Sequence, residues 1–284
     1  MSNYVIVTES GADIPPELAK RYKIEMIPMH ISFGGETKDD MTFPVEDAFE
    51  YYEKTGLLPQ TSGATPFDFE TVFDEIHRQY PQKHILHLAY SAATTCSYQS
   101  ALIAADGRDY ITSIDTKSVS AGQAMIVLSM AEYLGENPKA SLEDVKEKAD
   151  RLISHIRMGF FPGDLAYLKA GGRVGNAAFL GATILSIKPL IEIENGKLVS
   201  TKKYRGSIAS VAAKLIRDYS KKYQLRKEKL ALVYSGRLDD TLKEIASKAA
   251  YDCGFRGILW VRAGCVVSTH SGPGGFGIVG LAKC

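Results

Sequence analysis

The first half of the chain alternates short β-branched runs with segments of helical periodicity, and this alternation constrains the fold more than any other feature. Strands are predicted over Tyr4–Thr8, Met26–Phe33, His84–Tyr90 and Asp109–Ile114. Helices are predicted over Pro15–Tyr22, Thr65–Tyr80, Thr94–Ala105, Gly122–Leu134 and Ser141–Arg157. Those that begin at Thr65 and Ser141 open with capping boxes. Strands joined by helices form parallel sheets that are covered on both faces. We therefore expect an N-terminal α/β domain with a parallel sheet.

The pattern changes after Gly159. Asn195-Gly196 lies between two predicted short strands, Ile187–Ile193 and Lys197–Tyr204, which is the signature of a β-hairpin. Helices and strands then alternate again, with helices over Ser207–Lys222 and Leu238–Cys253 and strands over Lys229–Tyr234, Gly257–Val261 and Cys265–Ser268. This indicates a second α/β domain, over residues 159–284, with a mixed sheet. The domain of residues 1–158 is expected to pack against it, with a ligand in the cleft between them.

Composition excludes several classes of protein. Lys and Arg number 34 and Asp and Glu 33, so the net charge is +1 and no nucleic acid is expected as a partner. The four cysteines form no C-x-x-C motif, which gives no support to a disulfide framework or a zinc site. The N-terminus has no basic region ahead of an apolar run, and no stretch is long enough to span a membrane. The sequence predicts a soluble, cytoplasmic protein without a metal.

Two glycine-rich segments carry a basic residue each. The segment from Val266 to Gly277 contains His270 and is predicted to be a strand that runs into a turn. The segment from Lys169 to Gly175 contains Arg173 and is predicted to be a loop. Glycines let backbone N–H groups approach a ligand closely, so each segment is suited to an anion.

Hydroxyl groups follow several of the predicted strands, where ligands of α/β sheets bind. Any one of these loops taken alone is explained better by helix caps and turns than by a ligand site. The four loops together, with Arg173 and His270, favour an anion site. The loops are Thr8–Ser10, Thr61–Thr65, Ser91–Thr95 and Asp115–Ser118.

The chain resembles the DegV family from end to end. The resemblance is carried by the segments Val5–Ser10, Pro59–Ser62, Ser97–Ala101, Tyr167–Val174, Ile187–Pro189 and Ser271–Gly277. It implies a two-domain α/β protein that binds one long-chain fatty acid between its domains and needs no cofactor. It also implies that the protein is the non-catalytic subunit of a fatty acid kinase and presents the carboxylate to a separate ATP-binding subunit. Transient contact with a membrane is compatible with this role.

The resemblance assigns roles to individual residues. Thr61 and Ser62 match a carboxylate-binding pair, and Thr95 stands where a serine usually does the same work. Two basic residues near the carboxylate correspond to Arg173 and His270, and Arg205 corresponds to a residue needed for docking to the kinase. The chain departs from the family pattern at Glu9, Gly63-Ala64 and Ala92–Cys96.

Other readings stay open at the level of sequence. The residues also fit a self-sufficient acyl- or phosphoryl-transfer enzyme, with Thr95 or Ser62 as nucleophile and His270 as base. A small-molecule sensor on the same fold is a third reading. If a fatty acid binds, its tail is expected to contact Met26–Phe33, Met158–Phe161 and Ala177–Leu185, each of which also reads as ordinary core.

Overall fold

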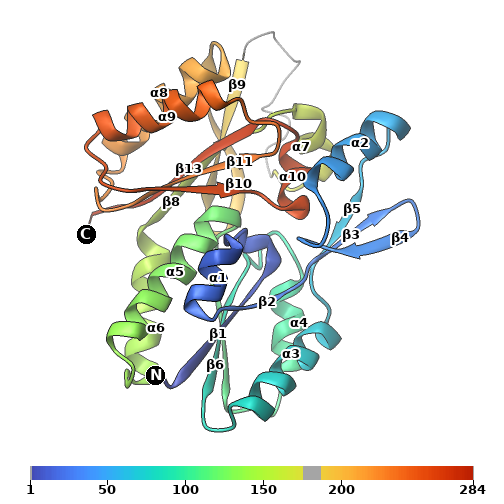
Figure 1. Ribbon diagram of the computed structural model, residues 1–284, viewed down its shortest axis with the longest axis vertical. Helices are drawn as coiled ribbons and strands as arrows, with labels where there is room; N and C mark the ends of the chain where they lie inside the picture. The colour runs from blue at the N-terminus through green and yellow to red at the C-terminus, as the bar shows by residue number, and fades with distance from the viewer. Residues whose placement is uncertain (1, 175–186, 284) are drawn as a thin grey trace.

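The computed structural model describes residues 2–174 and 187–283, which form two α/β domains stacked on each other (Figure 1). The N-terminal sheet has the order β2-β1-β6-β7, and all of its neighbouring strands are parallel, as the sequence predicts. Its strands are β1 (Tyr4–Glu9), β2 (Glu25–Ile27), β6 (His84–Ala89) and β7 (Ile111–Asp115). The carboxyl ends of these strands point toward the second domain (Figure 1).

Helices cover both faces of this sheet. On one side lie α3 (Pro66–Gln79) and α4 (Ser97–Ala104); on the other lie α1 (Pro16–Tyr22), α5 (Ser120–Glu136) and α6 (Leu142–His155) (Figure 1). The first turns of α3 and α6 are closed by capping boxes, Thr65 with Asp68 and Ser141 with Asp144. Both capping boxes were predicted from the spacing of these residues. Each one stabilises its helix because it pairs N–H groups that the helix itself leaves free.

The second sheet is mixed, as predicted. Its order is β10-β9-β8-β13-β11-β12, in which β11 and β12 are parallel and the other neighbours are antiparallel. The strands are β8 (Ile156–Phe161), β9 (Ile187–Glu194), β10 (Lys197–Arg205), β11 (Leu230–Ser235), β12 (Ile258–Arg262) and β13 (Gly275–Leu281). Helices α8 (Ile208–Lys222) and α9 (Asp240–Asp252) cover one face, and α5, α7 (Leu165–Gly171) and α10 (Cys265–Ser271) lie on the face toward the N-terminal domain (Figure 1).

Helix α5 joins the two domains into one packed body. It contacts β1 and β6 of the first sheet and β8, β11 and β13 of the second. Its side chains are buried nearly all round, with Ile126 in the core of the N-terminal domain and Met125 in the core between the domains. A helix that is apolar on every side is stable only when it is enclosed in this way.

A small antiparallel sheet projects from the N-terminal domain and was not predicted. It consists of β4 (Glu36–Asp39), β3 (His30–Phe33) and β5 (Gln60–Ser62), and α2 (Val45–Thr55), also missed, connects two of its strands. The prediction of one strand over Met26–Phe33 is wrong, because the chain leaves the parallel sheet after Ile27 and enters the small sheet at His30. Pro28, which has no backbone N–H to donate, stands at the break.

Several predictions for the chain after residue 140 differ from the structure. The predicted strand Cys265–Ser268 is part of helix α10, and the central strand β13 begins within the predicted turn, at Gly275. The predicted helix Ser141–Arg157 ends at His155, where β8 begins and continues past the predicted domain boundary after residue 158. In the segment predicted as a basic loop, Lys169–Gly171 form the end of α7 and Gly175 lies outside the described residues.

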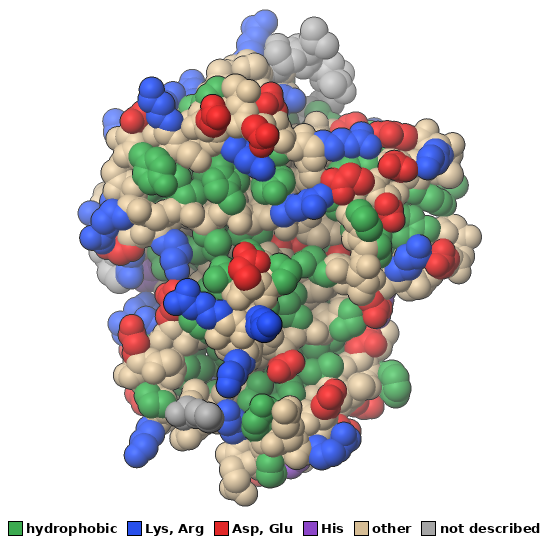
Figure 2. Space-filling model, viewed as in Figure 1, with side chains coloured by type: hydrophobic (Ala, Val, Ile, Leu, Met, Phe, Trp, Pro, Cys, Tyr) green, Lys and Arg blue, Asp and Glu red, His purple; other side chains and the backbone are tan. Residues whose placement is uncertain are grey.

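Charges of both signs are interspersed over the surface that Figure 2 displays, in keeping with the near-zero net charge. Within residues 2–174 and 187–283, no helix combines the length and the apolar character that crossing a membrane requires.

The β9–β10 hairpin ties the two domains together through its turn. Asn195 and Gly196 both have positive φ, as the predicted two-residue turn requires. The Ser91 hydroxyl, from the N-terminal domain, donates a hydrogen bond of 2.7 Å to the carbonyl of Gly196. A Cβ atom at Gly196 would lie 2.6 Å from that hydroxyl oxygen.

We expect Gly196→Ala to destabilise the protein more than Gly107→Ala does. Both glycines have positive φ, which costs alanine about 1 kcal/mol, but a Cβ at Gly107 would meet nothing within 4 Å. The difference in the free energy of urea-induced unfolding between the two variants measures the close approach of the hairpin to Ser91. Equal destabilisation would show that the hairpin does not hold the domains together.

Candidate functional site

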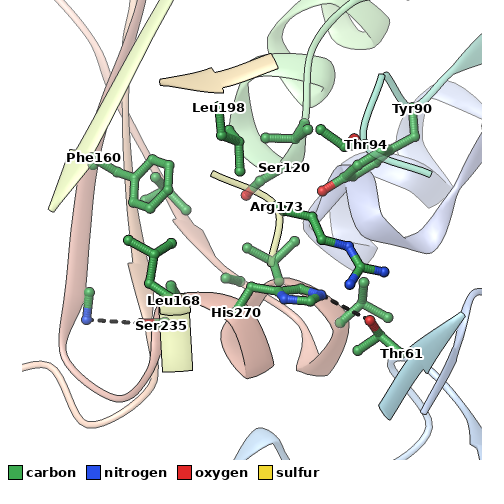
Figure 3. Close-up of a pocket in the computed structure, with 18 of the residues that line it drawn as sticks. Thr61, Tyr90, Thr94, Ser120, Phe160, Leu168, Arg173, Leu198, Ser235 and His270 are labelled. Carbon is green, nitrogen blue, oxygen red and sulfur yellow. Dashed lines mark hydrogen bonds between the residues drawn. The ribbon is translucent and has the colours of Figure 1, made fainter. Parts of the chain in front are cut away.

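A pocket lies between the two domains, on the side where β1, β6 and β11 end. It contains about 910 Å³ of space free of protein atoms, open solvent at its mouth included. Its apolar wall comes mainly from the C-terminal domain and is formed by Met29, Val119, Met158, Phe160, Leu168, Leu198, Val233, Ala263, Val266, Val267 and Phe276. Hydroxyl and basic side chains line the rest (Figure 3).

Five of the six predicted site residues lie in this one pocket. They are Thr61, Ser62, Thr95, Arg173 and His270, and they come from the small sheet, the loop before α4, the residues after α7, and α10. Arg205 does not line the pocket; it is exposed at the end of β10. Of the predicted tail contacts, Met29, Met158 and Phe160 line the pocket, while residues 177–185 lie outside the described part of the chain.

Thr61 and His270 contact each other directly across the domain interface. The Oγ1 atom of Thr61 lies 2.9 Å from Nε2 of His270 (Figure 3). The other ring nitrogen, Nδ1, is buried against Gly171 and has no hydrogen-bond partner among the described residues. A side chain at position 171 would occupy the space of the imidazole, so Gly171 is what allows α7 to pack against His270.

His270 is a neutral imidazole at physiological pH. Burial, with a smaller contribution from the positive charge of Arg173, lowers the pKa of His270 to about 4. A neutral ring carries one N–H, so it can donate a hydrogen bond from one nitrogen and accept one at the other. Near an anionic group, the lasting positive charge is therefore the guanidinium of Arg173.

Arg173 is placed by its neighbours on both sides. One of its terminal nitrogens donates a hydrogen bond of 2.7 Å to the carbonyl of Gly171. The next residue, Val174, forms a parallel β-bridge with Leu198 of β10. Figure 3 shows the guanidinium directed toward the space between Thr61 and the Tyr90 ring.

Thr61 and Ser62 are held by strand pairing and by a charged cluster. Thr61 pairs with Ile31 and Ser62 with His30 of β3. The His30 ring contacts Asp39 at 2.9 Å and Asp68, at the start of α3, at 3.0 Å. Burial alone would lower the pKa of His30, but the hydrogen bonds with the two carboxylates outweigh it and raise this pKa, which favours the charged ring.

The loop that carries Thr95 rests on the buried Glu9. Its carboxylate accepts hydrogen bonds from the backbone N–H of Tyr90 (2.8 Å) and from the hydroxyl of Ser97 (2.9 Å). Burial opposes ionisation of Glu9, yet the nearby His87 and the Tyr90 N–H lower its pKa. Gly63 approaches the same loop closely, since a Cβ there would lie 2.6 Å from Thr95 Oγ1. Of the positions expected to depart from the family pattern, Gly63 lines the pocket and Glu9 supports the loop that carries Thr95.

Two aspartates of the N-terminal domain hold the first turn of α10. Asp13 accepts a hydrogen bond of 2.7 Å from the N–H of Gly264, and Asp40 accepts one of 2.9 Å from the N–H of Cys265. Both side chains are buried, which raises their pKa values; the charge of Asp40 adds to the effect on Asp13, whose pKa lies well above its usual range. A protonated Asp13 relieves the repulsion between the two carboxyl groups.

Several of these residues were not identified from the sequence. Asp13 and Asp40 gave no signal, because their partners lie more than two hundred residues away in the chain. Tyr90 and Ser120, which also line the pocket, each adjoin a hydroxyl-rich loop after a predicted strand, and their positions could have been used. In the described part of the chain, no group of three or more His, Cys, Asp or Glu side chains is arranged to hold a metal ion.

The arrangement suits an anion attached to an apolar body. A buried carboxylate needs hydrogen-bond donors and a positive charge, which the hydroxyls, the imidazole and Arg173 can provide. The wall of aliphatic and aromatic side chains provides a surface for an aliphatic chain.

We expect the imidazole resonances of His270 to stay constant in NMR spectra from about pH 8 to about pH 5, because its pKa is about 4. Arg173→Gln removes the nearby charge and should raise this pKa, while leaving it below that of a free histidine, since burial is the larger cause. A His270 ring that titrates near pH 6.5 in the parent protein would contradict the buried, neutral state.

Comparisons with known proteins agree with this architecture. The model of the family described as "Uncharacterised protein, DegV family" matches residues 3–283. A DegV domain-containing protein of Caldanaerobacter subterraneus is 28% identical over 282 residues, covering 98% of both chains. A DegV domain-containing protein from Streptococcus pyogenes is 30% identical, and the match covers 95% of each of the two chains.

Solved structures show the same fold. A DegV family protein from Thermus thermophilus, described by its fatty acid binding, has 26% identity and a TM-score of 0.88, with 99% of each chain covered. DegV from Bacillus subtilis, described as a fatty acid binding protein, has 24% identity and a TM-score of 0.85 over the full length of both chains. With a family model that matches nearly every residue, the chain belongs to the DegV family.

Proposed function

We propose that this protein binds one long-chain fatty acid in the pocket between its domains. The observation that carries the proposal is the division of this single pocket into a polar end, with Thr61, Thr95, Arg173 and His270, and an apolar wall. The fatty acid binding ascribed to the Thermus thermophilus relative, which shares the fold and 26% of its residues, supports the same ligand class.

The two parts of the ligand have different roles in this proposal. Burial of a sixteen-carbon tail offers about 12 kcal/mol of gross free energy, at ~0.8 kcal/mol for each carbon group, before the cost of association is subtracted. The carboxylate adds orientation, because it is stable only where charge-assisted hydrogen bonds replace water. The tail therefore sets the affinity and the polar end sets the direction of binding.

We further propose that the protein is a non-catalytic subunit that presents the carboxylate to an ATP-binding kinase subunit in the cytoplasm, after transient contact with a membrane. The resemblance of Arg205 to a docking residue of the family supports this step, and its exposed position at the end of β10 leaves it accessible to a partner. The pocket itself supplies no nucleotide-binding loop in the described residues.

The alternative of a self-sufficient transferase has one observation in its favour, the contact between a hydroxyl and the His270 imidazole. The hydroxyl is that of Thr61, whereas the sequence suggested Thr95 or Ser62 as the nucleophile. Among the described residues His270 Nδ1 has no carboxylate to orient it, which a hydroxyl–imidazole–carboxylate triad would need. We therefore favour binding over catalysis by the isolated chain.

Thr61→Val is expected to weaken fatty acid binding by about 1–2 kcal/mol, because it removes a hydroxyl at nearly constant volume. Titration of the delipidated protein with oleate, followed by calorimetry, measures the change. Thr71→Val, on the exposed face of α3 and away from the pocket, is the matched control and should bind as the parent does. Saturable binding that is equal in parent and Thr61→Val would refute the position of the carboxylate; no saturable binding by the parent would refute the function.

Arg205→Ala is expected to keep its fatty acid and to lose acyl phosphate formation when it is mixed with ATP and a kinase subunit from the same host. Docking requires a surface residue that the ligand does not touch. Lys197→Ala, exposed at the other end of β10, is the control. Hydroxylamine traps the acyl phosphate for measurement. Full activity of Arg205→Ala would contradict the docking role, and turnover by the isolated parent protein would favour the transferase.

A further inference from the structure

Tyr90 stands directly after strand β6 and reaches into the pocket from the N-terminal domain. Its backbone is fixed by the hydrogen bond from its N–H to Glu9. Its ring is fixed by Gly11, where a Cβ atom would lie 2.9 Å from ring atom Cε2 and 2.7 Å from the sulfur of Met29. The glycine therefore lets the ring lie flat against the N-terminal domain and sets the direction of its hydroxyl.

The hydroxyl of Tyr90 points into the pocket, toward the space between Ser120 and Arg173 (Figure 3). It makes no hydrogen bond with any residue in the described part of the chain, whereas two neighbouring hydroxyls already donate to the protein. Ser120 donates to Asp13, and Thr94 donates to the carbonyl of Ser91. Tyr90 thus offers a donor that the protein itself does not use.

The chemistry of this hydroxyl favours an anionic acceptor. Burial, and the carboxyl groups of Asp13 and Glu9 to a smaller extent, raise the pKa of Tyr90 well above its usual range, so the O–H proton is retained. A donor that loses its water when a ligand enters, and gains no acceptor, weakens binding. A plain aliphatic tail has no acceptor. A carboxylate held by the nearby Arg173 has two oxygens and can accept from several donors.

We propose that the Tyr90 hydroxyl donates a hydrogen bond to the ligand's carboxylate beside Arg173, and that it selects fatty acids over neutral lipids of the same chain length. This inference rests on the proposed fatty acid binding. It adds to the site a donor that directly follows β6 and lies outside the predicted set of hydroxyl and basic residues.

The test compares Tyr90→Phe with the parent for two ligands, oleate and oleyl alcohol. The substitution removes one oxygen and keeps the ring. Loss of a hydrogen bond to a charged group should weaken oleate binding by about 10- to 100-fold, with a clearly smaller loss for the uncharged alcohol. Tyr98→Phe, on α4 and outside the pocket lining, is the control and should leave both affinities unchanged.

Three outcomes would overturn the inference. Equal oleate affinity in parent and Tyr90→Phe would show that the hydroxyl does not contact the carboxylate. An equal loss for oleate and oleyl alcohol would place the effect on the tail. Absence of saturable oleate binding in the parent would refute the proposed function as well, so the two failures are distinguishable.

Discussion

Helix α10 belongs to the C-terminal domain, but its first turn is bonded to two carboxyl groups of the other domain. Asp13 and Asp40 accept hydrogen bonds from the N–H groups of Gly264 and Cys265, which no residue within the helix can pair. Position 264 leaves little room, since a Cβ there would lie 3.0 Å from Asp40 and 3.2 Å from Asp13. Because the same short helix carries His270 in its last turn, this contact fixes the imidazole relative to Thr61 and so shapes the polar end of the pocket.

The rest of the site follows from how the two domains meet. Helix α5 contacts both sheets, and the β9–β10 hairpin reaches Ser91 at the start of the loop that carries Thr95. The carboxyl ends of the parallel strands therefore face the apolar surface of the second sheet, which places hydroxyl donors opposite aliphatic side chains. A ligand with an anionic head and an apolar tail matches both surfaces at once. The neutral His270 offers hydrogen bonds to such a head group, and the charged Arg173 offers the compensating positive charge.

The sequence predicted the architecture where local and tertiary preferences agree. The capping boxes at Thr65 and Ser141 and the Asn195-Gly196 turn depend on contacts within a few residues. The parallel sheet pairs distant strands, but the alternation of strand and helix patterns along the chain indicates it. The prediction was wrong at α10 and β13, where contacts between residues far apart in the chain determine the secondary structure. The valines before His270 favour a strand, but the bonds from Asp13 and Asp40 stabilise a helix. Glycines disfavour a strand over Gly275–Leu281, yet Gly277 lies so close to Phe160 and Val233 that only glycine fits between the neighbouring strands.

Five residues of the predicted site lie together, although some of the elements that carry them differ from the prediction. Thr61, Ser62, Thr95, Arg173 and His270 meet in one pocket, although His270 was expected in a turn and Arg173 in a longer loop. The motifs of a family record which side chains meet, whatever the local backbone. Tyr90 was missed because a tyrosine at the end of a predicted strand is equally typical of the core. Its place in the site follows from the direction of its hydroxyl, which points into the pocket (Figure 3).

A crystal structure of the delipidated protein reloaded with a single fatty acid tests the proposed position of the ligand most directly. We expect one ligand between the domains, with its carboxylate within hydrogen-bond distance of Thr61 and Thr95 and its tail against Phe160 and Leu198. A fatty acid bound with its tail at Thr61 and His270, or bound outside this pocket, would contradict it.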